Sequence, residues 1–150
     1  MIENNILGVI LAGGKSSRFG SNKADAYLGD KTLLEHTIKK VENFFLEVLI
    51  VSNKENIKIN KKNVFLVKDY IKGQLGPLIG ILSAMKWVKE NNNKYKWIAT
   101  FPCDTPFFDG SIIEKLKNCS ISDKHLLFFL NSRKKRHNIF GLWSLKLIDI

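Results

Sequence analysis

The sequence is short of cysteine, of long apolar runs and of acidic residues, and each shortage excludes a class of protein. Its 150 residues include only two cysteines, Cys103 and Cys119, which are too few for the disulfide framework of a small secreted protein. They form no Cys-x-x-Cys pair, and the histidines have no paired spacing, so nothing indicates a zinc site. No apolar stretch reaches the roughly 18 residues of a membrane span, because Glu47 interrupts the longest candidate. The N-terminus lacks the basic start of a signal peptide, so we expect a cytoplasmic protein with no membrane partner.

The shortage of acidic residues leaves the chain strongly basic. Asp and Glu number 14 against 24 Lys and Arg, which gives a formal net charge of +10. This surplus favours anionic partners such as phosphates, nucleic acid or acidic lipid. AT-rich codon usage, which makes Lys, Asn and Ile plentiful, explains the surplus of basic residues equally well. No RNA- or DNA-binding motif is present, so we expect no nucleic-acid partner. The basic run 133–137 is typical of a solvated loop, and contact with an anionic substrate is the alternative.

Alternating apolar runs and helical patterns predict an α/β fold. Hydrophobic residues make up 45% of the chain and charged residues 25%, which excludes wholesale disorder. Short apolar runs predict strands at 6–11, 48–51, 64–67, 97–101, 126–130 and 139–143, with the polar segment 131–138 between the last two. Helices are predicted from residue 32 onward, over 77–91 and over 111–119, with another beginning near Ser144. We therefore expect one domain over 1–150, with three layers and a mostly parallel sheet.

Two of the helix starts carry a capping-box pattern. Thr32 precedes Glu35 by three residues, and Ser111 precedes Glu114 in the same way. In a capping box the hydroxyl of the first residue accepts a hydrogen bond from the backbone N–H of the last. We therefore expect Thr32 and Ser111 to be the N-caps of their helices.

A glycine-rich, basic loop follows the first predicted strand. Ligands of open parallel sheets bind beyond the carboxyl ends of the strands, so residues that follow strands are the candidates for a site. Gly13 and Gly14 let the backbone turn tightly and expose amide groups to an anion, and Arg18 and Lys23 add two cations. The loop matches neither the dinucleotide fingerprint nor the Walker A pattern, which needs a glycine where Val9 stands. It predicts the binding of a triphosphate, and a glycine-rich turn without a ligand is the alternative.

Two aspartates follow later strands. Asp104 comes just after the strand predicted at 97–101, where it is well placed to hold Mg²⁺ against phosphate oxygens, because hard cations prefer oxygen ligands. Asp69 follows the strand predicted at 64–67. Each aspartate alone could equally be the cap of a turn. Together with the basic loop they predict a phosphate-binding site at one edge of the sheet.

Four motifs, taken together, resemble those of the molybdenum cofactor guanylyltransferases. They are LAGGKSSRFG followed by Lys-Ala (11–24), Lys-Asp followed by LGPLIG (68–80), FPCDTPF (101–107) and HNIFGLW (137–143). They occur in the order and the approximate spacing of the family and cover nearly the whole chain. The resemblance implies a Rossmann-like nucleotide-diphospho-sugar-transferase fold. It also implies the transfer of GMP from GTP to molybdenum-bound molybdopterin, with release of pyrophosphate.

The resemblance also implies roles for individual residues. The backbone of the first motif would contact the nucleotide, through Leu11, Ala12, Gly13 and Gly14. Lys23 would bind phosphate and Arg18 would neutralise phosphate charge. Asp69 would bind the nucleotide, and Asp104 would bind both the nucleotide and Mg²⁺. The catalytic residues would therefore be Arg18, Lys23 and Asp104.

One further position and the partners follow from the same resemblance. The polar residue that contacts the base at the end of the second strand falls at Ser52 or Asn53, of which we favour Asn53. The expected cofactor is Mg²⁺, and the expected substrates are GTP and the molybdenum-molybdopterin acceptor. Other proteins of molybdenum cofactor synthesis or molybdoenzyme maturation are candidate partners, and we expect a monomer.

The chain departs from the family in two places. Asn138 stands where a proline usually follows the histidine, and the chain stops at Ile150, before the Asn-x-Asn-Thr-Pro segment that family members carry near the pterin. We therefore expect a domain that is truncated at its C-terminus. The Leu-Ala-Gly-Gly start favours GTP, since related cytidylyltransferases tend to carry Leu-Ala-Ala-Gly. The alternatives are a related enzyme that uses CTP or a sugar-phosphate acceptor, and a catalytically impaired GTP-binding fragment.

Overall fold

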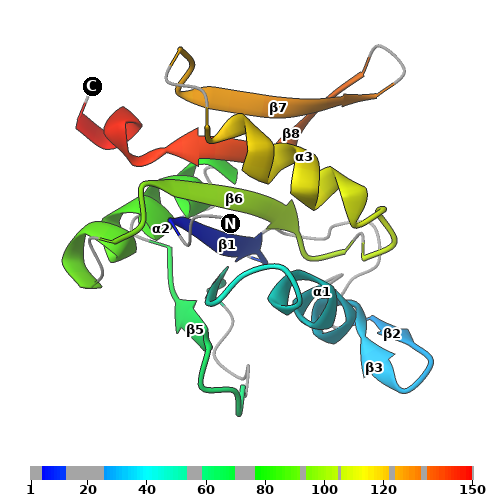
Figure 1. The fold of residues 1–150 in the computed structure, drawn as a ribbon. Coiled ribbons are helices and arrows are strands. Elements are labelled where there is room, and N and C mark those ends of the chain that lie inside the picture. The colour runs from blue at the N-terminus through cyan, green and yellow to red at the C-terminus, as the bar shows by residue number, and fades with distance from the viewer. Residues whose placement is uncertain are drawn as a thin grey trace.

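The computed structural model shows a six-stranded sheet between helices (Figure 1). It describes residues 5–12, 26–53, 59–69, 77–91, 94–104, 106–121, 124–132 and 135–149. The strands of this sheet are β1 (Ile6–Leu11), β4 (Val48–Val51), β5 (Val64–Val67), β6 (Trp97–Pro102), β7 (Leu127–Ser132) and β8 (Lys135–Ser144). The helices are α1 (Leu33–Glu42), α2 (Pro77–Asn91), α3 (Ser111–Cys119) and the 3₁₀ helix η2 (Leu145–Asp149).

The sheet is mostly parallel, as the sequence predicts. Its strand order is β5-β4-β1-β6-β8-β7, and the four neighbours β5, β4, β1 and β6 run parallel to one another. The strand β8 runs antiparallel to β6, and β7 runs antiparallel to β8. Within the described residues, no helix is long and apolar enough to span a membrane.

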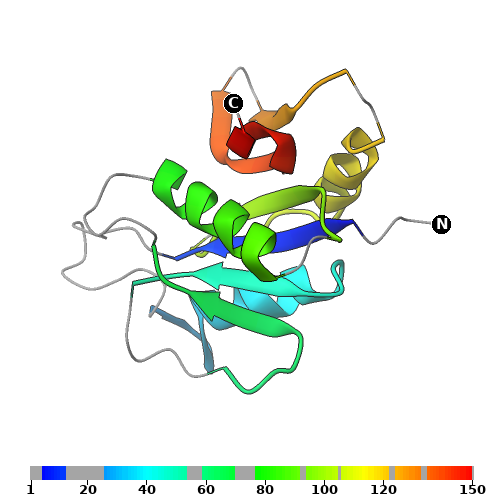
Figure 2. The same cartoon turned by 90° about the vertical axis from the view of Figure 1, so that its left-hand side faces the viewer.

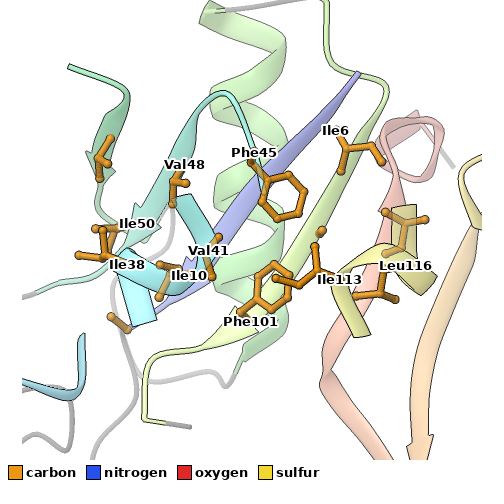
Figure 3. Packing of buried hydrophobic residues seen from close by; sticks show 14 of the residues in the cluster. Ile6, Ile10, Ile38, Val41, Phe45, Val48, Ile50, Phe101, Ile113 and Leu116 are labelled. Carbon is orange, nitrogen blue, oxygen red and sulfur yellow. The ribbon is translucent and has the colours of Figure 1, made fainter. Parts of the chain in front are cut away.

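Helices cover both faces of the sheet and give the expected three layers. On one face, α1 and α3 pack on side chains such as Ile10 and Phe101, and Figure 3 shows this cluster from close by. On the other face, α2 and η2 pack on Leu7 and Val9, and Figure 2 shows α2 lying across that face. Gly8 is needed where α1 approaches the sheet, because a Cβ atom at this position would lie 2.8 Å from the ring of Phe45. Burial on both faces explains why the parallel strands read as continuous apolar runs.

One of the two predicted capping boxes is present and the other is wrong. In α1 the backbone N–H of Glu35 donates to Thr32 Oγ1 over 3.1 Å, as expected. In α3 the N-cap is Gly110, without a side-chain bond, and Ser111 is already the first helical residue. The N–H of Ser111 donates instead to Asp109 Oδ1 over 3.0 Å. The N–H of Glu114, which the pattern assigned to the Ser111 hydroxyl, donates to the Gly110 carbonyl.

The last two strands of the sheet are longer than predicted. The polar segment expected to separate them is largely part of the hairpin, since β7 continues to Ser132 and β8 begins at Lys135. Apolar patterning reports burial, whereas backbone pairing continues through polar residues at an edge of the sheet. The short hairpin of β2 (Tyr27–Leu28) and β3 (Lys31–Thr32) was not predicted either. Its signal was the Gly-Asp turn, in which Gly29 has a φ of +70°.

A chain of hydrogen bonds fastens β8 to β6. The indole N–H of Trp143 donates to Thr100 Oγ1 over 3.0 Å, and that hydroxyl donates to the Ile139 carbonyl over 2.6 Å. Thr100 and Trp143 are both buried. Gly141 leaves room for this arrangement, because a Cβ atom there would lie 3.0 Å from the indole nitrogen.

We predict that Thr100 and Trp143 are energetically coupled. Thr100→Val leaves the buried indole N–H of Trp143 without its acceptor, which costs about 1–3 kcal/mol, and Trp143→Phe removes the donor to the Thr100 hydroxyl. Thr100→Val and Trp143→Phe should therefore each lower the free energy of unfolding, and the double variant should lose less than the sum of the two. Urea denaturation of the four proteins measures the coupling. Additive losses would contradict the role given to this hydrogen bond.

Candidate functional site at the carboxyl edge of the sheet

Four parallel strands end in a single row. The pairing places Leu11 opposite Val51 and opposite Pro102, and Val51 opposite Val67. The residues two positions beyond the ends of β4, β5 and β6 are Asn53, Asp69 and Asp104. All three are residues that the sequence analysis selected, and the register of the sheet explains why they share one edge.

The two aspartates of this edge are too far apart to share one ion. They follow β5 and β6, which are separated by three strand spacings of the sheet. At about 4.8 Å per spacing, the two strand ends lie about 14 Å apart. Among the residues that the structure describes, no group of three potential ligands could hold a metal ion.

The structure distinguishes between Ser52 and Asn53. Ser52 is only 1% exposed, and its backbone N–H donates to the Val67 carbonyl over 2.9 Å. Asn53 is exposed at the end of β4. Asn53 is therefore the one of the two whose side chain is accessible to a ligand.

Asn53 and Asp69 form a reciprocal pair. The Asn53 amide donates to Asp69 Oδ2 over 2.7 Å, and the backbone N–H of Asp69 donates to Asn53 Oδ1 over 3.0 Å. Burial raises the pKa of the Asp69 carboxyl above its usual value, and the hydrogen bond from Asn53 opposes that rise. The first turn of α2 lies close to the Asp69 carboxylate, since a Cβ atom on Gly80 would lie 3.7 Å from Asp69 Oδ1. The pair is thus an ordered polar group at the edge of the sheet.

Part of the backbone of the first motif already forms a hydrogen bond within the sheet. Ala12 is 1% exposed, and its N–H donates to the Val51 carbonyl over 2.8 Å. An anion at this point would therefore have to be bound by other amides. The remaining candidates of the loop, Gly13, Gly14, Arg18 and Lys23, lie outside the described residues.

Asp104 follows β6 in a turn that is fastened from several sides. The Thr37 hydroxyl of α1 lies 3.0 Å from the carbonyl oxygen of Cys103, the residue before Asp104. Farther along the turn, the ring of Phe108 stacks on Phe101 with centroids 5.5 Å apart. It also meets Phe140 of β8 edge-to-face at 5.2 Å. Asp104 itself is half-buried.

Part of the basic run 133–137, which was expected in a loop, lies in β8. Its first two residues lie outside the described part, and Lys135 begins β8, with His137 opposite Leu130. Because β8 is antiparallel to β6, it begins on the side where β6 ends (Figure 1). The backbone therefore places the start of β8 on the side of the sheet where Asp104 follows β6.

Other groups lie apart from this row. His36 is held by a contact of its Nε2 with the Leu28 carbonyl oxygen of β2 at 2.7 Å. A groove of about 520 Å³, which the sequence did not indicate, lies between α3 and β7. It is lined by residues such as Leu116, Phe128 and Leu130, and none of its lining residues belongs to the row.

The comparisons with known proteins identify the family. Residues 8–149 match the family described as the MobA-like NTP transferase domain. The chain belongs to this family. A relative from Haemophilus influenzae (strain 86-028NP), named molybdenum cofactor guanylyltransferase, is 32% identical over 143 residues, which cover 95% of this chain and 72% of that protein. A relative of the same name from Rhizobium rhizogenes is 31% identical over 93% of this chain and 64% of its own length. The chain is thus shorter than both MobA-like relatives.

Solved structures of MobA-like fold agree with the architecture. Molybdopterin-guanine dinucleotide biosynthesis protein A from Archaeoglobus fulgidus superposes with a TM-score of 0.74 at 19% identity, covering 95% of this chain and 69% of that one. The 4-diphosphocytidyl-2C-methyl-D-erythritol synthase from Anaerococcus prevotii superposes with a TM-score of 0.63 at 15% identity, over 95% and 70%. At these identities the likeness concerns the fold alone, and it confirms the fold class predicted from the sequence.

We predict that Asp69→Asn stabilises the folded protein at neutral pH. The raised pKa means that the wild type loses stability as the pH rises through the folded-state pKa of Asp69, whereas an amide does not titrate. The gain should be absent below the ordinary pKa of aspartate, grow as the pH rises through the raised pKa, and stay constant above it. Urea denaturation at several pH values measures the gain.

Asp109→Asn is the matched control. Hydrogen bonds from Ser111 lower the pKa of the exposed Asp109 carboxyl, so the charged form stabilises the folded state. This variant should lose stability relative to the wild type as the pH rises, which is the opposite trend. The same pH trend in both variants, or none in Asp69→Asn, would contradict the assignment.

Proposed function

We propose that the protein is a molybdenum cofactor guanylyltransferase, which transfers GMP from GTP to molybdenum-bound molybdopterin. The observation that carries the proposal is the 32% identity, over 95% of this chain, to the Haemophilus influenzae relative of that name. Membership of an NTP transferase family supports the class of reaction. The row of polar residues beyond β4, β5 and β6 supports its location. On this proposal residues 1–150 act as one nucleotidyltransferase domain, working as a cytoplasmic monomer.

The proposed reaction is a displacement at the α-phosphorus of GTP. An oxygen of the acceptor's terminal phosphate forms a new P–O bond there, while the bond to the oxygen that bridges the α- and β-phosphorus breaks. Pyrophosphate leaves with the electron pair of that bond. Arg18 and Lys23 are proposed to bind phosphate oxygens and to stabilise the charge that develops on the leaving group. Positioning and electrostatics supply the acceleration, without a covalent enzyme intermediate.

Asp104 is the residue proposed to hold Mg²⁺. This ion keeps several waters and binds through one or two carboxylates together with substrate phosphates. A single half-buried carboxylate at a strand end, outside any cluster of three ligands among the described residues, fits that requirement. When bound, Mg²⁺ neutralises charge on the phosphate oxygens.

The other end of the row is proposed to bind the nucleoside. Asn53 offers an exposed amide that both donates and accepts hydrogen bonds, and Asp69 orients it through the reciprocal pair. Because Asp69 lies three strands from Asp104, an extended nucleotide lying along the edge would reach both. The Leu-Ala-Gly-Gly start of the first motif supports GTP over CTP.

We predict that the wild type releases pyrophosphate from GTP when Mg²⁺ and molybdenum-molybdopterin are present. Asp104→Asn should reduce this rate by about 100-fold or more, because a group that stabilises developing charge is lost. CTP in place of GTP should be a poor substrate. A coupled pyrophosphate assay measures all three rates.

Asp109→Asn is the control for this experiment as well. It removes a carboxylate five residues farther along the same turn, where the side chain is exposed, and the amide oxygen of an asparagine can still accept the hydrogen bond from the N–H of Ser111. Its rate should match that of the wild type. No pyrophosphate release from GTP by the wild type would overturn the proposed function, and full activity of Asp104→Asn would overturn the role of Asp104.

A further inference from the structure

Thr37 is a buried polar residue on the apolar face of α1. It is 0% exposed and shares that face with Leu34, Ile38 and Val41. Its hydroxyl lies 2.9 Å from the carbonyl oxygen of Leu33, one turn earlier in α1, and 3.0 Å from the carbonyl oxygen of Cys103. A hydroxyl has a single proton, so the bond to its own helix and the bond to the turn share one donor. A valine would fill the same space without any polar group. The burial of a hydroxyl at this position is therefore explained by the hydrogen bonds that it makes.

The contact at Cys103 is one of several between α1 and the segment after β6. The ammonium of Lys40 lies 4.9 Å from the centroid of the Phe108 ring. Beyond the end of α1, the ring of Phe44 lies against Gly110, where a Cβ atom would be 2.8 Å away. These two contacts are a cation–π contact and a packing contact, and both hold the later part of the segment. Thr37 supplies a directional hydrogen bond at the beginning of the segment, to the carbonyl of Cys103 directly before Asp104.

We propose that Thr37 is a positioning residue for Asp104. The inference rests on the proposed function, because it concerns the carboxylate proposed to hold Mg²⁺. By fixing the carbonyl of Cys103, the Thr37 hydroxyl sets the direction in which the chain leaves β6 and with it the place of the Asp104 carboxylate. A metal ligand must be held within a fraction of an ångström by the groups behind it. Loss of the hydroxyl therefore weakens the binding of a divalent ion and leaves the sheet in place.

The test compares Thr37→Val, which keeps the shape and loses the donor, with Thr37→Ser, which keeps the donor and loses a methyl group. The probe is Mn²⁺, titrated into the full chain with a non-hydrolysable GTP analogue and followed by electron paramagnetic resonance. Loss of one hydrogen bond should raise the Mn²⁺ dissociation constant about fivefold in Thr37→Val. Thr37→Ser should bind Mn²⁺ like the wild type. In the pyrophosphate assay, the half-saturating Mg²⁺ concentration should rise by the same factor while kcat at saturating Mg²⁺ stays within about twofold.

Several results would overturn the inference. One is an unchanged Mn²⁺ dissociation constant in Thr37→Val, and another is an equal rise in Thr37→Ser, which would indicate packing alone. A fall in kcat without a change in half-saturating Mg²⁺ would do the same. If Thr37→Val fails to fold by circular dichroism, Thr37→Cys, with its weaker donor, should show a smaller rise in the same constant.

The outcome is separable from that of the proposed function. Mn²⁺ binding beside a GTP analogue needs neither the acceptor nor turnover. Absence of pyrophosphate release by the wild type would therefore reject the proposed reaction and leave the Thr37 comparison valid. Turnover by the wild type together with wild-type Mn²⁺ binding in Thr37→Val would reject the positioning role alone.

Discussion

The common register of four parallel strands is the constraint on which the rest of the structure depends. In β1, Leu7 and Val9 face α2 while Ile6 and Ile10 face α1 and α3, so both faces of the strand are buried. A slip of one residue would exchange the two faces, and burial therefore holds the register tightly. Because the register is held, the strands end level with one another. The alignment of Asn53, Asp69 and Asp104 along one edge therefore follows from the packing of the core.

The two ends of that row are held by different forces. At the β4–β5 end, Asn53 and Asp69 hold each other through side-chain hydrogen bonds, and burial makes the ionised carboxylate costly. At the β6 end, the backbone around Asp104 is anchored by Thr37 and by the aromatic contacts of Phe108. An ordered polar pair with an exposed amide suits hydrogen bonding to a nucleoside, whereas an anchored turn suits a carboxylate that must meet an ion in one geometry.

Local signals in the sequence predicted most of the fold, and contacts between distant residues account for what they missed. The bounds of β4, β5 and α2 agree with prediction because apolar runs and a starting proline mark them locally. The cap of α3 was wrong because Asp109, two residues earlier, accepts from the N–H of Ser111, and the N–H of Glu114 donates to the Gly110 carbonyl. The positions of Asp69 and Asp104 followed from their place after strands. The contacts of Asn53 with Asp69 and of Thr37 with Cys103 join residues 16 and 66 positions apart, and no local pattern reports them.

The motif HNIFGLW (137–143) contributes to the site indirectly, through contacts with β6 and with the turn after it. Phe140 and Trp143 follow no strand of the row, yet both act on β6. Trp143 binds Thr100 in the middle of that strand, and Phe140 packs on the ring of Phe108 beyond its end. The register places the last residues of β8 beside the middle of β6, and the earlier residues of β8 extend past the end of β6 to the turn after it. The register and the length of β8 therefore give the turn that contains Asp104 support from the sheet on one side and from α1 on the other.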